Sequence, residues 1–223
     1  MADAKDCLAW TREKLPELLA EQTDLRADAS RVAVMGHSAG AMLALQLGAA
    51  PSPPAAILCS SGLVYLSDPF WTQPLPAMAS VPTADPAFIA EIYNGPVALT
   101  SAPMFTPAGP NNSTPRTAWM INAMKAGSLY PDIIKDGNTE RVDPATGFSE
   151  SFPPTCFVHG TGDDYAPYRL IKRANDELKA KGVEVEYVEA EGQSHVFDMF
   201  LKEEDALFKD VVMKGLDFLK RHV

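Results

Sequence analysis

Short apolar segments alternate along the chain with longer segments whose apolar residues recur at helical spacing. Four short segments predict buried strands, three through uninterrupted apolar runs and the fourth through alternation: residues 31–35, 55–62, 155–163 and 183–192. Longer segments with helical periodicity or strong helix formers predict helices over residues 3–22, 41–50, 168–182 and 204–223. Strands that alternate with helices in this way are typical of an α/β fold built on a parallel sheet.

The region between the second and third predicted strands has a different composition. Residues 64–150 are rich in proline, methionine and aromatic side chains, with short helical stretches such as 115–127. A long insertion between two core strands is typical of a cap or lid over a site. We therefore predict a core formed by residues 1–63 and 151–223 and a helical cap at 64–150. The alternative is an inert subdomain with a small core of its own.

Charge and cysteine content narrow the class of protein. A net charge of −10 at pH 7 disfavours binding to nucleic acid, because such a surface repels phosphates. The three cysteines, Cys7, Cys59 and Cys156, are odd in number and widely spaced, which favours reduced thiols in an intracellular protein. The first ten residues are acidic where a secretory signal needs positive charge, and no apolar run approaches the roughly 18 residues of a membrane span. These features predict a cytoplasmic protein without a membrane span.

The clearest chemical signal is the sequence Gly-His-Ser-Ala-Gly at residues 36–40, between a predicted strand and a predicted helix. A serine hydroxyl is a weak nucleophile until a base removes its proton, so Ser38 would require a histidine and a carboxylate. Gly36 and Gly40 would let strand and helix approach closely, and the Ala39 amide would face a developing oxyanion. This context predicts a nucleophile; a crowded turn that merely needs small residues is the structural alternative.

The base can be selected by elimination among four histidines. His37 adjoins the serine and cannot readily turn its ring towards it, and His222 is the penultimate residue and is expected to fray. His159, at the end of the third predicted strand, is expected to have a structural or supporting role. His195 follows the fourth predicted strand, so it should emerge at the same edge of the sheet as Ser38. We therefore predict that His195 is the base, with a capping or surface histidine as the alternative.

An acid that orients this histidine is expected after the third predicted strand. The sequence His-Gly-Thr-Gly-Asp-Asp-Tyr at 159–165 offers two candidates, Asp163 and Asp164. The chain order serine, aspartate, histidine is the α/β-hydrolase order and differs from the orders of chymotrypsin-like and subtilisin-like proteases. The three residue types thus occur at the carboxyl ends of three predicted strands.

These motifs resemble those of α/β-hydrolases of the esterase and lipase class, which includes hormone-sensitive-lipase-like and carboxylesterase-like enzymes. Asp28 and Arg31 precede the nucleophile strand as in that group's D-x-x-R pattern. The acid loop resembles the family pattern H-G-x-x-D-x-x-V-P, which aligns Asp163 with the acid and Pro167 with the proline. The base loop resembles the pattern G-x-x-H-x-F, which Gly192, His195 and Phe197 match here.

The resemblance covers residues 20–62 and 152–223 and implies a catalytic triad of Ser38, Asp163 and His195. It also implies an oxyanion hole that contains the Ala39 amide. We expect neither a metal ion nor a cofactor, and a small-molecule ester as the substrate.

The chain departs from the family pattern ahead of the nucleophile. Family members carry four strands before the nucleophile strand, whereas Ser38 is reached almost at once, and the glycine-rich loop that supplies one oxyanion donor has no counterpart. The strand at 31–35 then becomes a sheet edge, which favours a homo-oligomer or cover by the N-terminal helix. Three explanations compete: a truncated product, a second chain that lends a donor, or cyclase, lyase or isomerase chemistry that needs no complete oxyanion hole.

Two functions therefore remain open. The first is a serine hydrolase that cleaves an uncharged carboxylic ester through an acyl-enzyme, with an apolar insertion that favours acyl or aromatic substrates. The second is a weakly active or inactive α/β-hydrolase remnant used for binding. The complete triad favours the first, and the missing strands favour the second.

Overall fold

The computed structural model describes residues 2–94 and 102–223, which form two compact units. The first unit comprises Met1–Leu66 and Glu140–Val223, and the second comprises Ser67–Thr139. The predicted insertion, 64–150, extends beyond the second unit at both ends and includes residues 95–101, which lie outside the described residues. The Asp143 carboxylate accounts for the difference, because it accepts hydrogen bonds from the Tyr65 and Leu66 amides at 3.0 and 2.7 Å within the first unit.

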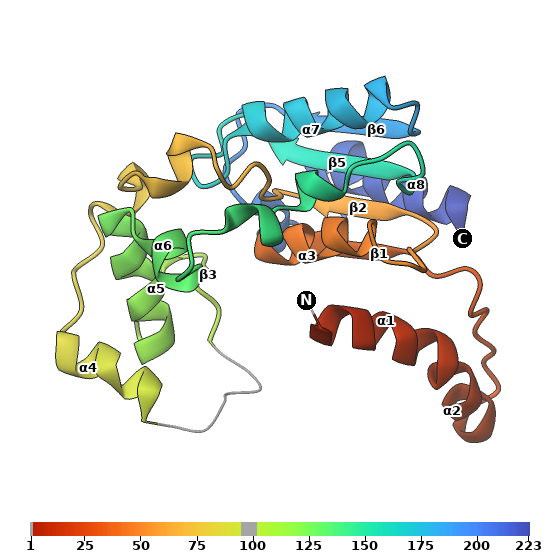
Figure 1. Cartoon of the computed structure of the whole chain (residues 1–223), viewed down its shortest axis with the longest axis horizontal. Coiled ribbons are helices and arrows are strands. Elements are labelled where there is room, and N and C mark those ends of the chain that lie inside the picture. The colour runs from red at the N-terminus through yellow and green to blue at the C-terminus, as the bar shows by residue number, and fades with distance from the viewer. Residues whose placement is uncertain (1, 95–101) are drawn as a thin grey trace. The chain divides into compact units, whose positions relative to one another are not determined.

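The first unit is built on a four-stranded parallel sheet with the strand order β1-β2-β5-β6 (Figure 1). The strands are β1 Val34–His37, β2 Ile57–Ser60, β5 Thr155–Gly160 and β6 Val185–Ala190. The predicted α/β fold with a parallel sheet is confirmed. All four carboxyl ends lie at one edge of the sheet, and this edge carries the residues of chemical interest.

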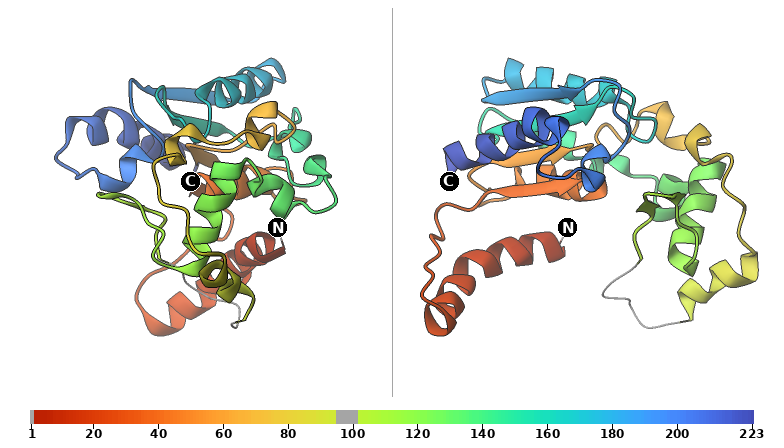
Figure 2. Two further views of the ribbon diagram at one scale, coloured as in Figure 1. Left: turned by 90° about the vertical axis from the view of Figure 1, so that its left-hand side faces the viewer. Right: turned by 180° about the vertical axis from the view of Figure 1, so that it is seen from behind.

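Helices cover both faces of this sheet (Figures 1 and 2). They are α3 Ala39–Leu47 and α7 Tyr168–Ala180 on one face, and the π-helical turn η7 Phe208–Val212 and α8 Met213–His222 on the other. Side chains of β2 alternate between the two faces, as expected for a strand. A Cβ added at Gly215 of α8 would lie 2.8 Å from the Leu58 side chain, so glycine lets α8 approach the sheet closely.

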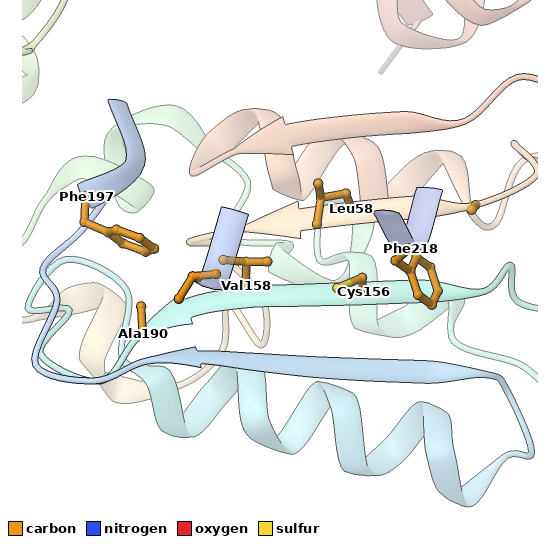
Figure 3. Close-up of a cluster of buried hydrophobic side chains, with 8 residues drawn as sticks. Leu58, Cys156, Val158, Ala190, Phe197 and Phe218 are labelled. Atoms are coloured by element: carbon orange, nitrogen blue, oxygen red, sulfur yellow. The ribbon is translucent and has the colours of Figure 1, made fainter. Parts of the chain in front are cut away.

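The core between α8 and the sheet is a continuous apolar cluster (Figure 3). It includes Leu58 of β2, Cys156 and Val158 of β5 and Phe218 of α8, all with 3% exposure or less. Phe197, which follows β6, joins the same cluster at the carboxyl end of the strands. This anchor brings the segment after β6 back over the sheet.

The predicted helix at 3–22 is two helices, α1 Ala2–Glu13 and α2 Leu15–Gln22. Lys14 separates them, and Pro16 lies in the first turn of α2. Proline has no amide hydrogen to bond the carbonyl one turn earlier, so the helical ladder breaks here. The Arg12 guanidinium donates to the carbonyls of Ser52 and Pro53, which ties α1 to the loop after α3.

Strand β1 lies at an edge of the sheet and begins later than the predicted strand at 31–35. It pairs with β2 alone among the described residues. Burial on both faces was predicted for this strand and is wrong, because Met35 is 51% exposed and its neighbours in β1 are half-buried. The outer edge of β1 therefore presents backbone groups that have no neighbouring strand in the described part of the chain.

We expect the isolated chain to self-associate through this edge. Replacing Met35 with lysine adds a charge to the edge strand, which opposes strand-to-strand pairing, and should shift the protein towards a monomer in sedimentation velocity. Leu25→Lys is the matched control, because Leu25 is 65% exposed and lies outside the sheet. A monodisperse monomer for the unaltered chain would contradict this expectation.

The second unit is mainly helical. Its helices and strands are α4 Pro86–Ala90, α5 Pro115–Ala126, α6 Leu129–Ile133, β3 Phe105–Thr106 and β4 Gly109–Pro110, with 3₁₀ turns at Pro69–Thr72, Pro76–Met78 and Glu91–Tyr93. The predicted helix at 115–127 is confirmed, with a Thr114 capping box at its start and Gly127 in the left-handed region at its end. Trp71, Met78 and Ile121 are buried within this unit, which therefore has an apolar core of its own. Its role as a cap stays a prediction.

Candidate active site

Ser38 occupies a strained turn between β1 and α3. Its φ of 52° and ψ of −119° lie in a region that residues other than glycine seldom adopt. The Ser38 amide donates to the Ser60 carbonyl at 3.0 Å, which extends the pairing of β1 with β2 into the turn. Because the chain reverses so sharply, α3 begins at the next residue, Ala39, whose amide at the first position of the helix has no carbonyl one turn earlier to bond.

Three side chains from three different loops form a continuous hydrogen-bonded series. The Ser38 hydroxyl lies 2.9 Å from Nε2 of His195, and Nδ1 of His195 lies 2.8 Å from Oδ2 of Asp163. His195 and Asp163 are buried, with 7% exposure each. The structure thus brings together the three side chains that the sequence predicts.

The partners determine which nitrogen of His195 carries the proton. An ionised carboxylate can only accept, so Nδ1–H donates to Asp163. Nε2 is then free to accept the hydrogen of the Ser38 hydroxyl. This is the arrangement in which a histidine can serve as a general base towards serine.

Asp163 is held as an ionised acceptor by its surroundings. Its Oδ1 accepts hydrogen bonds from the amides of Tyr165 at 2.9 Å and Ala166 at 2.8 Å. Burial alone would raise the pKa of this carboxyl, but hydrogen bonds from His159 and His195 hold the pKa well below its usual range. Asp163 therefore remains negative and fixed in orientation.

His159 is a second histidine on the same carboxylate. Its Nε2 lies 3.2 Å from Oδ2 of Asp163 and 2.7 Å from the Ala166 carbonyl, and the side chain is fully buried. Since both partners are acceptors, Nε2 carries the proton. The expected supporting role of His159 thus takes a specific form, a second donor to the same carboxylate oxygen that accepts from His195.

Two other residues considered from the sequence, Asp164 and His222, lie outside this hydrogen-bonded series. Asp164 is exposed, whereas its neighbour Asp163 is buried. The expectation that His222 frays is wrong, because it lies in α8, 3.4 Å from the Glu184 carboxylate, with its ring packed on Phe218.

Gly36 and Gly40 differ in why they are glycine. A Cβ at Gly36 would lie 2.2 Å from the Gly40 carbonyl oxygen, a backbone atom that cannot move aside. A Cβ at Gly40 would meet nothing within 4 Å. The close approach of strand and helix therefore requires a glycine at Gly36, whereas the same requirement, predicted for Gly40, is wrong.

We expect Gly36→Ala to disrupt the turn and Gly40→Ala to be tolerated. The forced contact in Gly36→Ala should lower the free energy of unfolding by about 1–3 kcal/mol, as overpacking usually does, and should displace Ser38. Urea denaturation of the two variants measures the difference. Equal stability of the two would contradict this account of the turn.

Two features that residues 2–94 and 102–223 lack bear on other classes of function. No group of three or more histidine, cysteine or acidic side chains there is arranged to hold a metal ion. Within the same residues, no helix combines the length and apolar character needed to cross a bilayer. The cytoplasmic location stays a prediction.

Comparison with known families identifies the superfamily. The model described as "Alpha/beta hydrolase family" matches residues 2–210. The chain belongs to the alpha/beta hydrolase family. The finer resemblance to hormone-sensitive-lipase-like enzymes rests on the motifs alone.

The curated relatives of this alpha/beta hydrolase are much longer chains. It is 29% identical over 259 residues to non-reducing polyketide synthase mapC of Penicillium brevicompactum and 30% identical over 263 residues to non-reducing polyketide synthase ausA of Penicillium brasilianum. Each alignment covers 100% of this chain and 10% of the relative. The chain thus spans about a tenth of the length of these relatives.

Solved structures show the same fold at low identity. An esterase from Thermogutta terrifontis with butyrate bound matches at a TM-score of 0.57 and 18% identity, covering 99% of this hydrolase and 64% of that chain. The same esterase phosphorylated by paraoxon matches at a TM-score of 0.55 and 19% identity, covering 99% and 62%. At this identity the likenesses establish only the fold of the chain.

Sequence reasoning missed the stacking partner of His195. The Tyr165 ring lies 5.3 Å from the His195 ring at an interplanar angle of 24°, on the side of the acid loop. An aromatic residue two positions after the acid was visible in the sequence, but nothing there distinguished a ring that stacks on the base from one exposed to solvent.

Proposed function

We propose that the chain is a serine hydrolase that cleaves an uncharged carboxylic ester of a small molecule through an acyl-enzyme. The observation that carries this proposal is the series Ser38, His195 and Asp163, with contacts of 2.9 and 2.8 Å. The finer assignment to the hormone-sensitive-lipase-like and carboxylesterase-like group belongs to the same proposal.

The reaction proceeds in two halves. Ser38 Oγ attacks the ester carbonyl carbon while His195 Nε2 takes the hydroxyl proton, and the resulting imidazolium gives that proton to the departing alcohol. Water then attacks the acyl-enzyme, with His195 again accepting and returning one proton, and releases the carboxylic acid and free Ser38. Asp163 stabilises the imidazolium and keeps the ring in the required tautomer.

The oxyanion formed in each half needs hydrogen-bond donors. The Ala39 amide, at the start of α3, is the donor that we assign, with support from the helix dipole. Loss of one donor from an oxyanion hole typically lowers kcat by about 10²–10³-fold, so a site with one donor would be slow. This keeps the weakly active remnant as the alternative, and the edge position of β1 is the observation in its favour.

Charge and relatives support an uncharged acyl substrate. The net charge of −10 disfavours anionic esters, and the structurally similar Thermogutta esterase was solved with butyrate bound. The relatives named polyketide synthases favour one variation, since a polyketide is assembled from acyl units. In that variation a nucleophile within the substrate, rather than water, takes the acyl group from Ser38, which gives cyclase chemistry.

A fluorophosphonate probe and a panel of esters test the proposal. We expect the unaltered chain to be labelled covalently and to hydrolyse neutral esters faster than esters of the same chain length that carry a carboxylate. Cyclase chemistry predicts labelling with little hydrolysis. A chain that is neither labelled nor active would favour the binding remnant.

A further inference from the structure

The segment that carries His195 has a strained backbone. Val196, the next residue, has φ 46° and ψ 37°, in the left-handed region that β-branched residues avoid. Such a conformation persists only where the surroundings hold it. On one side the buried Phe197 anchors the segment in the apolar cluster beneath the sheet edge (Figure 3).

Polar contacts hold the other side of the same segment. The Val196 amide donates to the Ser61 hydroxyl at 3.3 Å, and the Ser60 hydroxyl donates to Oδ2 of Asp198 at 3.3 Å. Both serines lie at the carboxyl end of β2, in or directly after the strand. The base segment is thus fastened to the strand that lies between the nucleophile and the acid in the sheet.

Asp198 also reaches the nucleophile strand. Its Oδ2 lies 3.2 Å from Nδ1 of His37, the last residue of β1 and the neighbour of Ser38. The Asp198 side chain is 7% exposed and the His37 side chain 34%. A carboxylate this deeply buried requires a positive partner, and His37 is the basic side chain that faces it.

The charge state of His37 favours this contact. The nearby Asp198 carboxylate raises the pKa of His37, and this outweighs burial, which would lower that pKa. His37 faces the Asp198 carboxylate from the segment after β6. That carboxylate also accepts a hydrogen bond from the Ser60 hydroxyl of β2. Since the pKa of His37 is raised, the ion pair forms below that pKa wherever the carboxylate is ionised, and it is lost as the pH rises through the pKa of His37.

We propose that Asp198 is a positioning residue for His195, which through His37 and Ser60 ties the segment bearing the base to the strand bearing the nucleophile. This inference rests on the proposed function for its catalytic consequence. A misplaced base costs rate because proton transfer from Ser38 requires close alignment. Asp198 contacts His37 and Ser60, neither of which is a reacting group, so its effect on the reaction is indirect.

Nuclear magnetic resonance tests the contact without reference to activity. His37→Asn keeps a hydrogen-bond donor but cannot titrate, so the resonance missing from this variant identifies His37. We expect the pKa of His37 to fall in Asp198→Asn and to stay unchanged in Asp210→Asn, a control at an exposed acidic residue of η7. An unchanged His37 pKa in Asp198→Asn would overturn the proposal.

Kinetics and hydrogen exchange test the positioning role. We expect Asp198→Asn to lower kcat for a neutral ester about 10-fold with a smaller change in KM, relative to Asp210→Asn. In the unaltered protein kcat should fall as the pH rises through the pKa of His37, and this alkaline fall should be absent from His37→Asn. Equal kcat in Asp198→Asn and Asp210→Asn would overturn the positioning role.

The two proposals fail in different ways. If the unaltered chain has no Ser38-dependent turnover, the proposed function fails, and amide exchange over residues 195–199 decides the positioning role. Faster exchange in Asp198→Asn than in Asp210→Asn supports the tether in that case, and equal exchange overturns it.

Discussion

Ser38→Ala should abolish covalent labelling by a fluorophosphonate and lower ester turnover by about 10⁴-fold or more. The hydroxyl oxygen is the atom that lies 2.9 Å from Nε2 of His195, and alanine has nothing to replace it. Labelling followed by mass measurement of the intact protein, alongside initial rates with a neutral ester, checks both parts of the expectation.

The fold should survive this substitution, which makes the loss interpretable. Alanine and serine both carry a Cβ, so the backbone strain at φ 52° is similar in the two proteins. The hydrogen bond from the amide of residue 38 to the Ser60 carbonyl involves only backbone atoms, so it is kept. Ser149→Ala, at an exposed surface position, is the matched control and should be labelled fully. Undiminished labelling of Ser38→Ala would place the reactive group elsewhere and remove the proposed function.

Asp163→Asn should lower kcat/KM by about 10³–10⁴-fold. If the amide oxygen keeps the Oδ1 position, where two backbone amides donate, its NH₂ group must face Nδ1 of His195. That group donates, so His195 is driven to carry its proton on Nε2 and can no longer accept one from Ser38. The same NH₂ group also meets the proton on Nε2 of His159, which destabilises the loop further.

Asp164→Asn isolates the role of the neighbouring acid. Because Asp164 is exposed, its substitution should change the rate and the stability little, within about 0.5 kcal/mol. Steady-state rates of the two variants, each checked by circular dichroism, make the comparison. A larger loss in Asp164→Asn would mean that the acid loop adopts a different arrangement during catalysis.

The parallel sheet and the convergence of the three loops were predictable because each rests on local patterns. Apolar runs marked the strands, and in a parallel sheet their carboxyl ends must share an edge, which brings Ser38 and His195 together. Elimination among four histidines selected the one that lies 2.9 Å from Ser38, although the reason given for excluding His222, fraying, is wrong. The acid was ambiguous from sequence, since burial of Asp163 and exposure of Asp164 depend on how the loop folds.

Other features depend on tertiary contacts that no local pattern records. The contact between Asp198 and His37 joins a 3₁₀ turn after β6 to the last residue of β1, and these two strands are not neighbours in the sheet. Asp198 is not one of the residues that the base-loop pattern specifies. The two predicted glycines of the turn look equivalent in sequence, yet the backbone path makes a Cβ impossible at Gly36 and harmless at Gly40. The break between α1 and α2 was readable from Pro16, but the apolar periodicity across it obscured the signal.

The separation of Ser38 and His195 by 157 residues has a consequence for how activity is acquired. The pairing of β2 with β5 joins Ile57 to Thr155, and contacts so distant along the chain are slow to form because a long loop must close before they stabilise anything. The three side chains can come together only when β1, β5 and β6 are all in the sheet. Because the entropy of closing a loop grows only with the logarithm of its length, the unit between β2 and β5 can lengthen or shorten at a cost of about 0.6 kcal/mol per doubling. Evolution can thus remodel Ser67–Thr139 extensively while the chemistry at the sheet edge stays intact.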